Sequence, residues 1–370
     1  LAVNGSPAVP SYSINAADPG DNSYHTFYAG VQPMYDVQNV SIDNSVFHEV
    51  NTANTITGTI RNLGSETVTS VDVNYTVDGG PAVAATVSGL NIASGASATY
   101  SHPTDWTPTM FQTYTIETEV TMVNGNMDSN TGDNLASIDI LAHPPAVART
   151  PLLEAFTSST CGPCTPGNIN VGNVLSNFQG EYSKVNYQMS WPGTGDPYCT
   201  AESNERRNYY SINSIPRMEV DGGWDGNASS FTSQMHSDAT GMPAFMEITA
   251  ESIQWGKHVE LNVEVNPASD FQGNNTLHVA IMEKLTFNNE KTNGEAEFEN
   301  VMKKMMTGAV GINLGTLKKD TKVERKFTWN FKGDYRLPFD GQSANWINHN
   351  TAHSVEEFED LIIAVWIQNA

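Results

Sequence analysis

The sequence has few cysteines, few basic residues and no long apolar run, and each shortage excludes a class of protein. Three cysteines in 370 residues are too few for a small scaffold held together by disulfides. No run of about 18 apolar residues is present, so the sequence predicts no transmembrane helix. The chain also lacks a Ser-His-Asp signature, a Gly-rich phosphate loop and an H-E-x-x-H motif. We therefore predict no cofactor and no metal site.

Basic residues are scarcest in the first half of the chain. The sequence holds 18 Lys+Arg against 41 Asp+Glu, a formal net charge of -23. Only Arg61 and Arg149 precede Lys184, the first lysine. Nucleic acids and anionic membranes bind clustered cations, so we expect neither as a partner. Solubility alone is a sufficient explanation of so acidic a surface.

The chain length and the positions of turn-forming residues and prolines predict several domains. A chain of 370 residues is long enough for two or three. Residues 1–30 contain many turn formers and no hydrophobic period, so we expect an extended tail there. The clearest boundary is His143-Pro144-Pro145-Ala146, a stiff junction of polyproline type. The abundance of Asn, Ser, Thr and Gly and the shortage of Lys are typical of exported bacterial β-proteins, which favours secretion.

Residues 31–146 contain short alternating runs between turns. Thr55–Arg61 alternates, and Val71–Val77 alternates again before Asp78-Gly79-Gly80, which is a hairpin signal. About seven short strands in about 110 residues are typical of an immunoglobulin-like β-sandwich. We therefore predict such a β-sandwich for residues 31–146.

Residues 147–243 change to a mixed α/β pattern around two cysteines. A buried strand over Pro151–Phe156 leads into Cys161-Gly162-Pro163-Cys164, and a helix is predicted over Asn168–Phe178. A strand that delivers C-x-x-C to the start of a helix is the layout of a thioredoxin-like redox site. The alternation continues with two strands and two helices: Lys184–Met189, Thr200–Tyr210, Ser214–Gly223 (a strand opened by proline) and Phe231–Ala239.

Residues 244–370 return to strands, and we predict a C-terminal β-sandwich. The predicted strands are Phe245–Ile253, His258–Val265, Leu277–Phe287, Lys322–Phe331 and Asp360–Gln368. One helical insertion is predicted over Glu297–Met306, where Phe298, Val301 and Met305 fall on one side. The last strand is apolar and stops without a hairpin partner, so we expect the native chain to extend beyond Ala370.

The two spaced cysteines supply what disulfide exchange needs. Cys161 lies where a helix N-terminus favours a thiolate, and Cys164 lies close enough to resolve a mixed disulfide. A stable disulfide that only staples the helix to its strand is the alternative. Cys199 is the odd cysteine, and it is a third redox thiol, a link to a partner chain or an inert buried thiol.

Two regions resemble known families. In the first, Arg61-Asn62-Leu63-Gly64, a hairpin, Thr104-Asp105-Trp106-Thr107-Pro108 and Asn130-Thr131-Gly132-Asp133-Asn134 resemble the CARDB module of bacterial adhesion-related proteins. Such modules space or dock other domains. This resemblance implies no catalytic residues within residues 31–146.

The second resemblance covers about residues 150–370. The motifs are Glu154-x-Phe156-Thr157 with the C-x-x-C, then Gly195-Asp196-Pro197, and then Ser214-Ile215-Pro216. They resemble the Omp28-related outer-membrane proteins of Bacteroidetes, which join a thioredoxin-like domain to a β-rich domain. The resemblance implies a secreted or cell-surface protein associated with the outer membrane, and it brings no defined reaction.

The thioredoxin-like resemblance also gives roles to two further residues. It implies that Pro216 is cis and lies against the C-x-x-C, where it shapes a substrate groove. Thioredoxins carry a tryptophan before the first cysteine, where this chain has Thr160. They also carry a buried acid beneath the disulfide, and Glu154 lies one position upstream of that place. Glu154 is therefore either a proton relay or a capped, solvent-linked glutamate.

Two hypotheses of different classes follow. In the first, the protein is a candidate thiol-disulfide oxidoreductase that exchanges disulfides with protein thiols through Cys161, Cys164, Pro216 and Glu154. In the second, it is a structural, adhesive or complex-forming surface protein, and the disulfide is only a staple. The sequence does not identify the partner protein, the direction of exchange or the oligomeric state.

Overall fold

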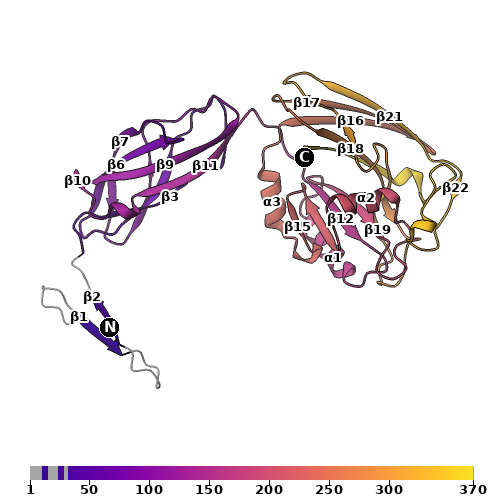
Figure 1. Cartoon of the computed structure of the whole chain (residues 1–370), viewed down its shortest axis with the longest axis horizontal. Helices are drawn as coiled ribbons and strands as arrows, with labels where there is room; N and C mark the ends of the chain where they lie inside the picture. The colour runs from indigo at the N-terminus through magenta and orange to yellow at the C-terminus, as the bar shows by residue number, and fades with distance from the viewer. Residues whose placement is uncertain (1–10, 16–23, 29–31, 370) are drawn as a thin grey trace. The chain divides into compact units, whose positions relative to one another are not determined.

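The computed structural model describes residues 11–15, 24–28 and 32–369. The chain forms two compact units, residues 1–144 and 145–370 (Figure 1). The division lies within the proline-rich junction at 143–146. In the predicted tail, β1 (Ser11–Asn15) pairs antiparallel with β2 (Tyr24–Tyr28), and the other residues of 1–30 lie outside the described ones. Among the described residues, no helix has the length and apolar character needed to cross a membrane.

Besides the β1–β2 pair, the described residues of the first unit form two β-sheets. One has the order β4-β11-β9-β6-β7 with β10 on β9, and the other has the order β3-β5-β8. The strands of the larger sheet are β4 (Phe47–Glu49), β6 (Val68–Val77), β7 (Val83–Ile92), β9 (Gln112–Val123), β10 (Asn126–Met127) and β11 (Leu135–His143). Those of the smaller sheet are β3 (Val37–Ile42), β5 (Thr57–Asn62) and β8 (Ser97–Ser101).

The core of this unit lies between its two sheets. Val71 and Val73 of β6 are buried on the inner face and pack with Val37 of β3 and Ile60 of β5. The alternation of inward apolar residues with outward polar ones is what a two-layer β-structure requires. The structure therefore confirms the predicted immunoglobulin-like sandwich in the first half of the chain.

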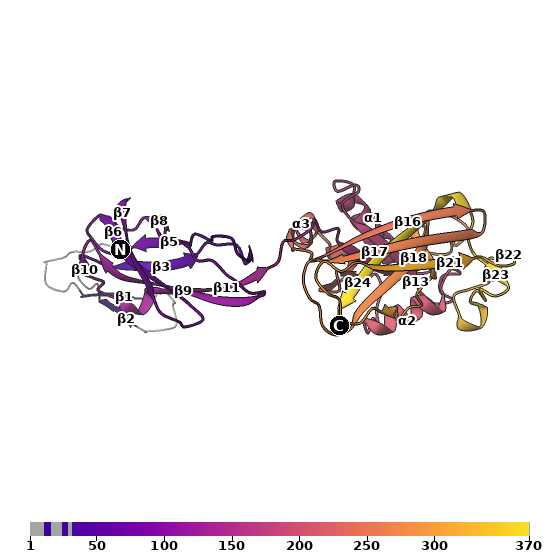
Figure 2. The same cartoon turned by 90° about the horizontal axis from the view of Figure 1, so that it is seen from above.

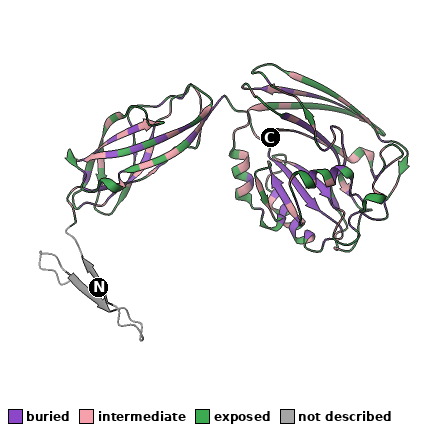
Figure 3. Ribbon diagram, viewed as in Figure 1, coloured by how far each residue is buried: buried purple, intermediate pink, exposed green. Residues whose placement is uncertain are grey.

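The second unit is built on one mixed sheet of eight strands. Its order is β15-β14-β12-β13-β19-β18-β20, with β24 paired to β18. The strands are β12 (Leu152–Thr157), β13 (Ser183–Gln188), β14 (Arg217–Val220), β15 (Trp224–Gly226), β18 (Asn275–Thr286), β19 (Phe298–Met305), β20 (Ile312–Asn313) and β24 (Leu361–Asn369). Figure 3 shows that buried residues are concentrated in the central strands of this sheet.

Three helices cover the two faces of this sheet. They are α1 (Cys164–Leu175), α2 (Ala201–Tyr209) and α3 (Ser233–Gly241). α1 connects β12 to β13, which pair in parallel. Val171 and Leu175 of α1 pack on one face, whereas residues of the other face pack with Ile212 and Tyr210 at the end of α2. Figure 2 shows α1 and α2 on opposite sides of the strands.

A second, three-stranded sheet packs against the far end of the large one. It has the order β16-β17-β21, formed by β16 (Met246–Trp255), β17 (His258–Pro267) and β21 (Val323–Asn330). Leu261 and Val263 of β17 share a core with Leu277 and Val279 of β18. A short parallel pair, β22 (Asp334–Tyr335) and β23 (Ala352–His353), completes the strands of this unit among the described residues.

The predicted boundary at residues 243 and 244 lies inside this unit. β13 pairs with β19 through Asn186 and Val301, so strands from both sides of the boundary share one sheet. A free-standing thioredoxin-like domain is therefore not supported. The strands predicted for a C-terminal sandwich do form two layers that face each other. One of these layers is part of the eight-stranded sheet, so the strands do not form a separate domain.

The helix predicted over Glu297–Met306 is wrong, because this segment forms β19. β19 lies between β13 and β18 and is covered on both faces, so its burial does not alternate. Asn300 also has a φ of 51°, a conformation that interrupts a regular strand. A strand buried on both faces carries apolar residues at irregular spacing, which here matched a helical period.

Candidate functional site

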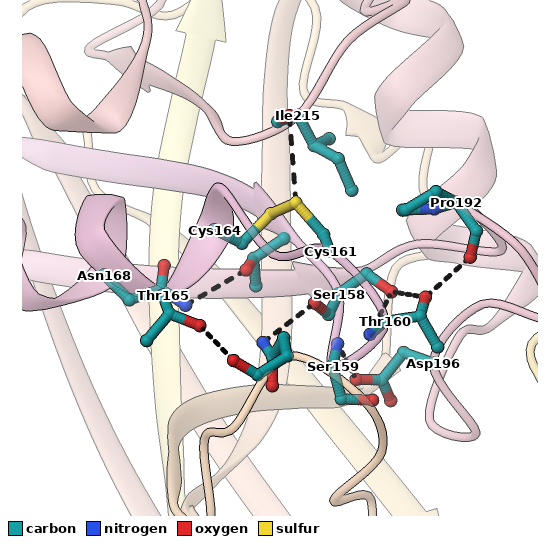
Figure 4. The surroundings of a disulfide bond; sticks show 12 residues. Ser158, Ser159, Thr160, Cys161, Cys164, Thr165, Asn168, Pro192, Asp196 and Ile215 are labelled. Carbon is teal, nitrogen blue, oxygen red and sulfur yellow. Dashed lines mark hydrogen bonds between the residues drawn. A yellow bond between two sulfur atoms is a disulfide. The ribbon is translucent and has the colours of Figure 1, made fainter.

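Cys161 and Cys164 form a disulfide at the junction between β12 and α1 (Figure 4). The S–S distance is 2.00 Å and the two Cα atoms are 5.3 Å apart. Cys164 is the first residue of α1, and Cys161 lies in the turn that precedes it. The C-x-x-C is therefore at the end of a buried strand and the start of a helix, as the sequence predicts.

Local hydrogen bonds fix the turn that carries the disulfide. The N–H of Cys161 donates to the Ser158 carbonyl, and the N–H of Cys164 donates to the Cys161 carbonyl, both at 3.0 Å. The hydroxyl of Thr160 donates to the carbonyl of Pro192 at 2.7 Å. Thr160, which stands where thioredoxins have tryptophan, thus ties the turn to a neighbouring loop.

Asp196 is the buried anchor of this turn. Its carboxylate accepts from the N–H of Ser159 at 2.9 Å, from the N–H of Tyr198 at 2.8 Å and from the amide of Asn289 at 3.1 Å. The Asp196 residue is 0% exposed. Burial raises the pKa of the Asp196 carboxyl, and the donated hydrogen bonds oppose that rise.

The segment 292–293 holds the other side of the turn. The N–H groups of Thr292 and Asn293 both donate to the Ser159 carbonyl, at 3.0 and 2.9 Å. The side chain of Thr165 in α1 donates to the Asn293 carbonyl at 3.0 Å. This segment is more than 120 residues away in sequence, roughly a third of the chain, so no local pattern identifies it.

Pro216 lies against the C-x-x-C region, and its peptide bond with Ile215 is cis, as predicted. The Sγ atom of Cys161 is 3.8 Å from the carbonyl oxygen of Ile215. A Cβ atom added to Gly167 of α1 would be 3.0 Å from the Pro216 ring, which shows how closely the helix and the proline pack. The fold therefore brings Cys161, Cys164 and Pro216 together. The bond between Trp191 and Pro192 is also cis, and nothing in the sequence predicted it.

Access to the sulfurs is limited in this structure. Cys161 is 1% exposed and Cys164 is 0% exposed. Ile215 lies next to the disulfide in Figure 4. Disulfide exchange requires an incoming sulfur to reach one of these atoms, and both are buried in this structure.

Glu154 lies elsewhere, in a buried polar cluster on the α2 side of the sheet. Its carboxylate accepts from the guanidinium of Arg206 at 2.8 Å, from the hydroxyl of Tyr187 at 2.8 Å and from that of Tyr210 at 2.6 Å. The side chains of Glu154 and Arg206 are each 1% exposed. These contacts engage both carboxylate oxygens, and they show a buried ion pair in place of the solvent-linked glutamate considered from the sequence.

Cys199 is a free thiol inside the second unit. It is 1% exposed, and burial together with the nearby Asp196 carboxylate raises the pKa of its thiol well above the ordinary value. Since the thiolate is the reactive form, this environment suits an inert thiol better than a third redox group.

Asp196, Asn289 and the segment 292–293 are parts of the site that were not predicted from the sequence. Asp196 carried a signal, because it belongs to the Gly195-Asp196-Pro197 motif on which the family resemblance rests. That motif gives no indication that the carboxylate accepts from Ser159, since the contact joins two loops.

Comparison with known proteins identifies one part of the chain. The CARDB family model matches residues 36–137, which lie in the first unit. The match agrees with the CARDB-like module predicted from the sequence, and it does not reach the disulfide. No curated protein matches the chain.

Several solved structures are similar to parts of the chain. Protein AGR_C_4864 from Agrobacterium tumefaciens is 13% identical over 59% of this chain and 95% of its own, with a TM-score of 0.35. HBP35 of Porphyromonas gingivalis is 14% identical over 60% of this chain and 70% of its own, with a TM-score of 0.42. The CARDB domain of the PF1109 protein from Pyrococcus furiosus is 22% identical over 31% of this chain and 95% of its own, with a TM-score of 0.25. At these scores, none of the three carries an argument about function.

Proposed function

We propose that the second unit exchanges its Cys161–Cys164 disulfide with thiols of other proteins. The observation that carries the proposal is the convergence of three elements on one sulfur pair. The disulfide joins the end of β12 to the start of α1, and the carbonyl of Ile215 lies 3.8 Å from the Cys161 sulfur. β12, α1 and β13 form a parallel strand–helix–strand unit within the larger sheet, and the C-x-x-C lies where β12 leads into α1.

The proposed step is a thiol–disulfide exchange that conserves electrons and protons. In the reduced protein, the Cys161 thiolate attacks a disulfide of a substrate protein, forms a mixed disulfide and releases a substrate thiolate, which takes up a proton. The Cys164 thiolate then attacks the Cys161 sulfur, forms the intramolecular disulfide and releases the second substrate thiol. External thiols then reduce the Cys161–Cys164 disulfide by the same steps in reverse, which regenerates the reduced protein.

Pro216 and Glu154 have different places in this proposal. Pro216 and the Ile215 carbonyl form the edge over which a substrate chain would approach Cys161. Glu154 is paired with Arg206, so we propose that it positions α2 against the sheet. The proton-relay role of Glu154 stays a prediction, because the contacts described above join its carboxylate to Arg206 and two tyrosines and not to the disulfide.

A second candidate is favoured by a specific observation. Cys161 is 1% exposed, which suits a disulfide that only staples α1 to its strand. In that case the protein is a structural, adhesive or complex-forming protein whose first unit spaces or docks other domains.

For both candidates, we propose a secreted or cell-surface location in association with the bacterial outer membrane. The supports are the CARDB match at residues 36–137 and the Omp28-type motifs of Bacteroidetes around the C-x-x-C. Protein thiols, or a surface protein partner, are the proposed partners.

Reduction of insulin by dithiothreitol separates the two candidates. If the disulfide turns over, the full chain accelerates insulin reduction and Cys161→Ser removes the acceleration. Cys199→Ser is the matched control, since it also replaces one buried cysteine by serine, and it should keep the wild-type rate. Equal and negligible rates for wild type and Cys161→Ser would favour the staple.

A further inference from the structure

A pocket of about 300 Å³ lies between α1, β13 and the segment 295–299. It is lined by residues that include Asn168, Lys184, Asn186, Gln188, Glu295 and Glu299, and neither disulfide cysteine lines it. The pocket is on the α1 face of the large sheet. It is therefore separate from the sulfur pair, although it shares α1 with it.

The floor of the pocket is formed by three alternate residues of β13. Lys184, Asn186 and Gln188 are opposite Leu153, Ala155 and Thr157 of β12 and share their face of the sheet. They are only 8%, 5% and 1% exposed. Central strands of buried sheets are normally apolar, so three polar side chains in a row need an explanation.

Hydrogen bonding within the described residues gives only part of that explanation, because Nδ2 of Asn186 donates to the Glu299 carbonyl at 2.6 Å and the other amide atoms are unpaired. Both amide atoms of Gln188 and the Oδ1 atom of Asn186 are shut off from solvent and have no hydrogen-bond partner. An unpaired buried polar atom destabilises a fold, and native proteins keep few of them. A ligand that reaches the floor of the pocket would supply the missing partners.

The charges around the floor indicate the kind of ligand. Lys184 Nζ is 3.6 Å from the carboxylate of Glu299, whose side chain is 64% exposed at the rim. Burial lowers the pKa of Lys184, and the Glu299 carboxylate opposes that effect. The rim is acidic, because Glu295, Glu297 and Glu299 all line the pocket. The floor therefore offers one cation and amide groups, and the rim offers carboxylates.

We propose that this pocket binds a small zwitterion, a free α-amino acid or a dipeptide. The ligand carboxylate is held at the floor by the Gln188 amide N–H group, which becomes accessible when the ligand enters, and it is attracted by the positive charge of Lys184 farther along β13. Its ammonium group is held by the carbonyl oxygen of Asn186 and by the acidic rim. The volume is at the small end of the range of ligand pockets, which suits a molecule of this size.

The test is thermal unfolding of the full chain with and without L-alanine, L-glutamine or glycylglycine at millimolar concentration. Binding to the folded state raises the melting temperature. N-acetyl-alanine amide, which lacks both charges, should give no shift. Isothermal titration calorimetry with the best of the three zwitterions should give a saturable heat.

Gln188→Met is the decisive variant, because it keeps the side-chain length and removes both amide atoms. Those atoms have no protein partner, so its unliganded melting temperature should equal or exceed that of the wild type. Its affinity for the zwitterion should fall roughly tenfold or more, since the hydrogen bond to the ligand carboxylate is lost. Lys184→Met should weaken binding in the same way, and Gln234→Met on the exposed face of α3 is the matched control that should keep it.

Several results would overturn the proposal. One is the absence of any shift or heat with all three zwitterions. Another is equal binding of N-acetyl-alanine amide, and a third is unchanged affinity in both Gln188→Met and Lys184→Met. None of these results depends on the disulfide, so a failure here is distinct from a failure of the proposed exchange reaction.

Discussion

Nη2 of Arg206 lies 2.8 Å from each carboxylate oxygen of Glu154, and each of the two side chains is 1% exposed. The pair joins α2 to β12. Nη1 of Arg206 also donates to the side chain of Gln368 in β24 at 3.0 Å. A single guanidinium thus connects a helix to two strands that are distant in the sequence.

We predict that Arg206→Met lowers the free energy of unfolding by about 3–5 kcal/mol, because it leaves the Glu154 carboxylate buried and unpaired. Urea denaturation measures the loss. Arg207→Met is the control on the same helix and should cost much less, since Arg207 is only half-buried. If the two variants lose equal free energies of unfolding, the buried ion pair does not stabilise the fold more than the half-buried Arg207 does.

Asp196→Asn should loosen the turn that carries the disulfide. The carboxylate accepts from the N–H of Ser159, and an amide places an N–H group among those donors. We expect a loss of about 1–3 kcal/mol in unfolding free energy and faster hydrogen exchange of the Ser159 amide. Asp238→Asn, on the surface of α3, should leave that amide protected. Unchanged exchange at Ser159 in Asp196→Asn would exclude the anchoring role.

Two glycines of α1 should respond oppositely to alanine. A Cβ atom at Gly167 would lie 3.0 Å from Pro216 Cγ and 3.3 Å from Ala228 Cβ, so Gly167→Ala should destabilise by about 1–3 kcal/mol. A Cβ atom at Gly172 would meet nothing within 4 Å, so Gly172→Ala should stabilise the helix by about 1 kcal/mol. Thermal unfolding distinguishes them, and a neutral Gly167→Ala would mean that Pro216 does not pack tightly on α1.

Glu219 should make stability fall as the pH rises. Burial and the neighbouring Asp225 carboxylate raise the pKa of Glu219 to about 8. The folded protein therefore holds a proton on Glu219 that the unfolded chain releases at a lower pH. This contribution to stability is full below the unfolded pKa and is lost as the pH rises through about 8.

The measurement is the melting temperature of the wild type and of Glu219→Gln across that range of pH. Glutamine keeps the shape of the protonated acid and does not titrate. The variant should match the wild type at mildly acidic pH and exceed it in alkaline buffer. Parallel curves at all values of pH would contradict the assignment.

The site was predictable where the pattern was local. The apolar run before Cys161 and the spaced cysteines indicate a strand, a turn and a helix, and β12 and α1 follow in that order. Hydrophobic alternation also indicated the strands of the first unit, because one face of each sheet is buried.

The parts that were missed depend on contacts between distant segments. β19 was predicted as a helix because a strand covered on both faces has no period of two. The buried ion pair of Glu154 has no local signal, because its partner, Arg206, lies 52 positions later in the chain. The pairing of β13 with β19, which merges two predicted domains, has no local signal at all.

The proposed exchange is tested most directly by a redox titration of the Cys161–Cys164 pair. The full chain carrying Cys199→Ala would be equilibrated in glutathione buffers, and free thiols would be counted by alkylation and mass spectrometry. We predict that the pair passes from oxidised to reduced within the range of glutathione buffers. A pair that stays fully oxidised across the whole range of glutathione buffers, as structural disulfides with potentials below roughly −300 mV do, would contradict the account.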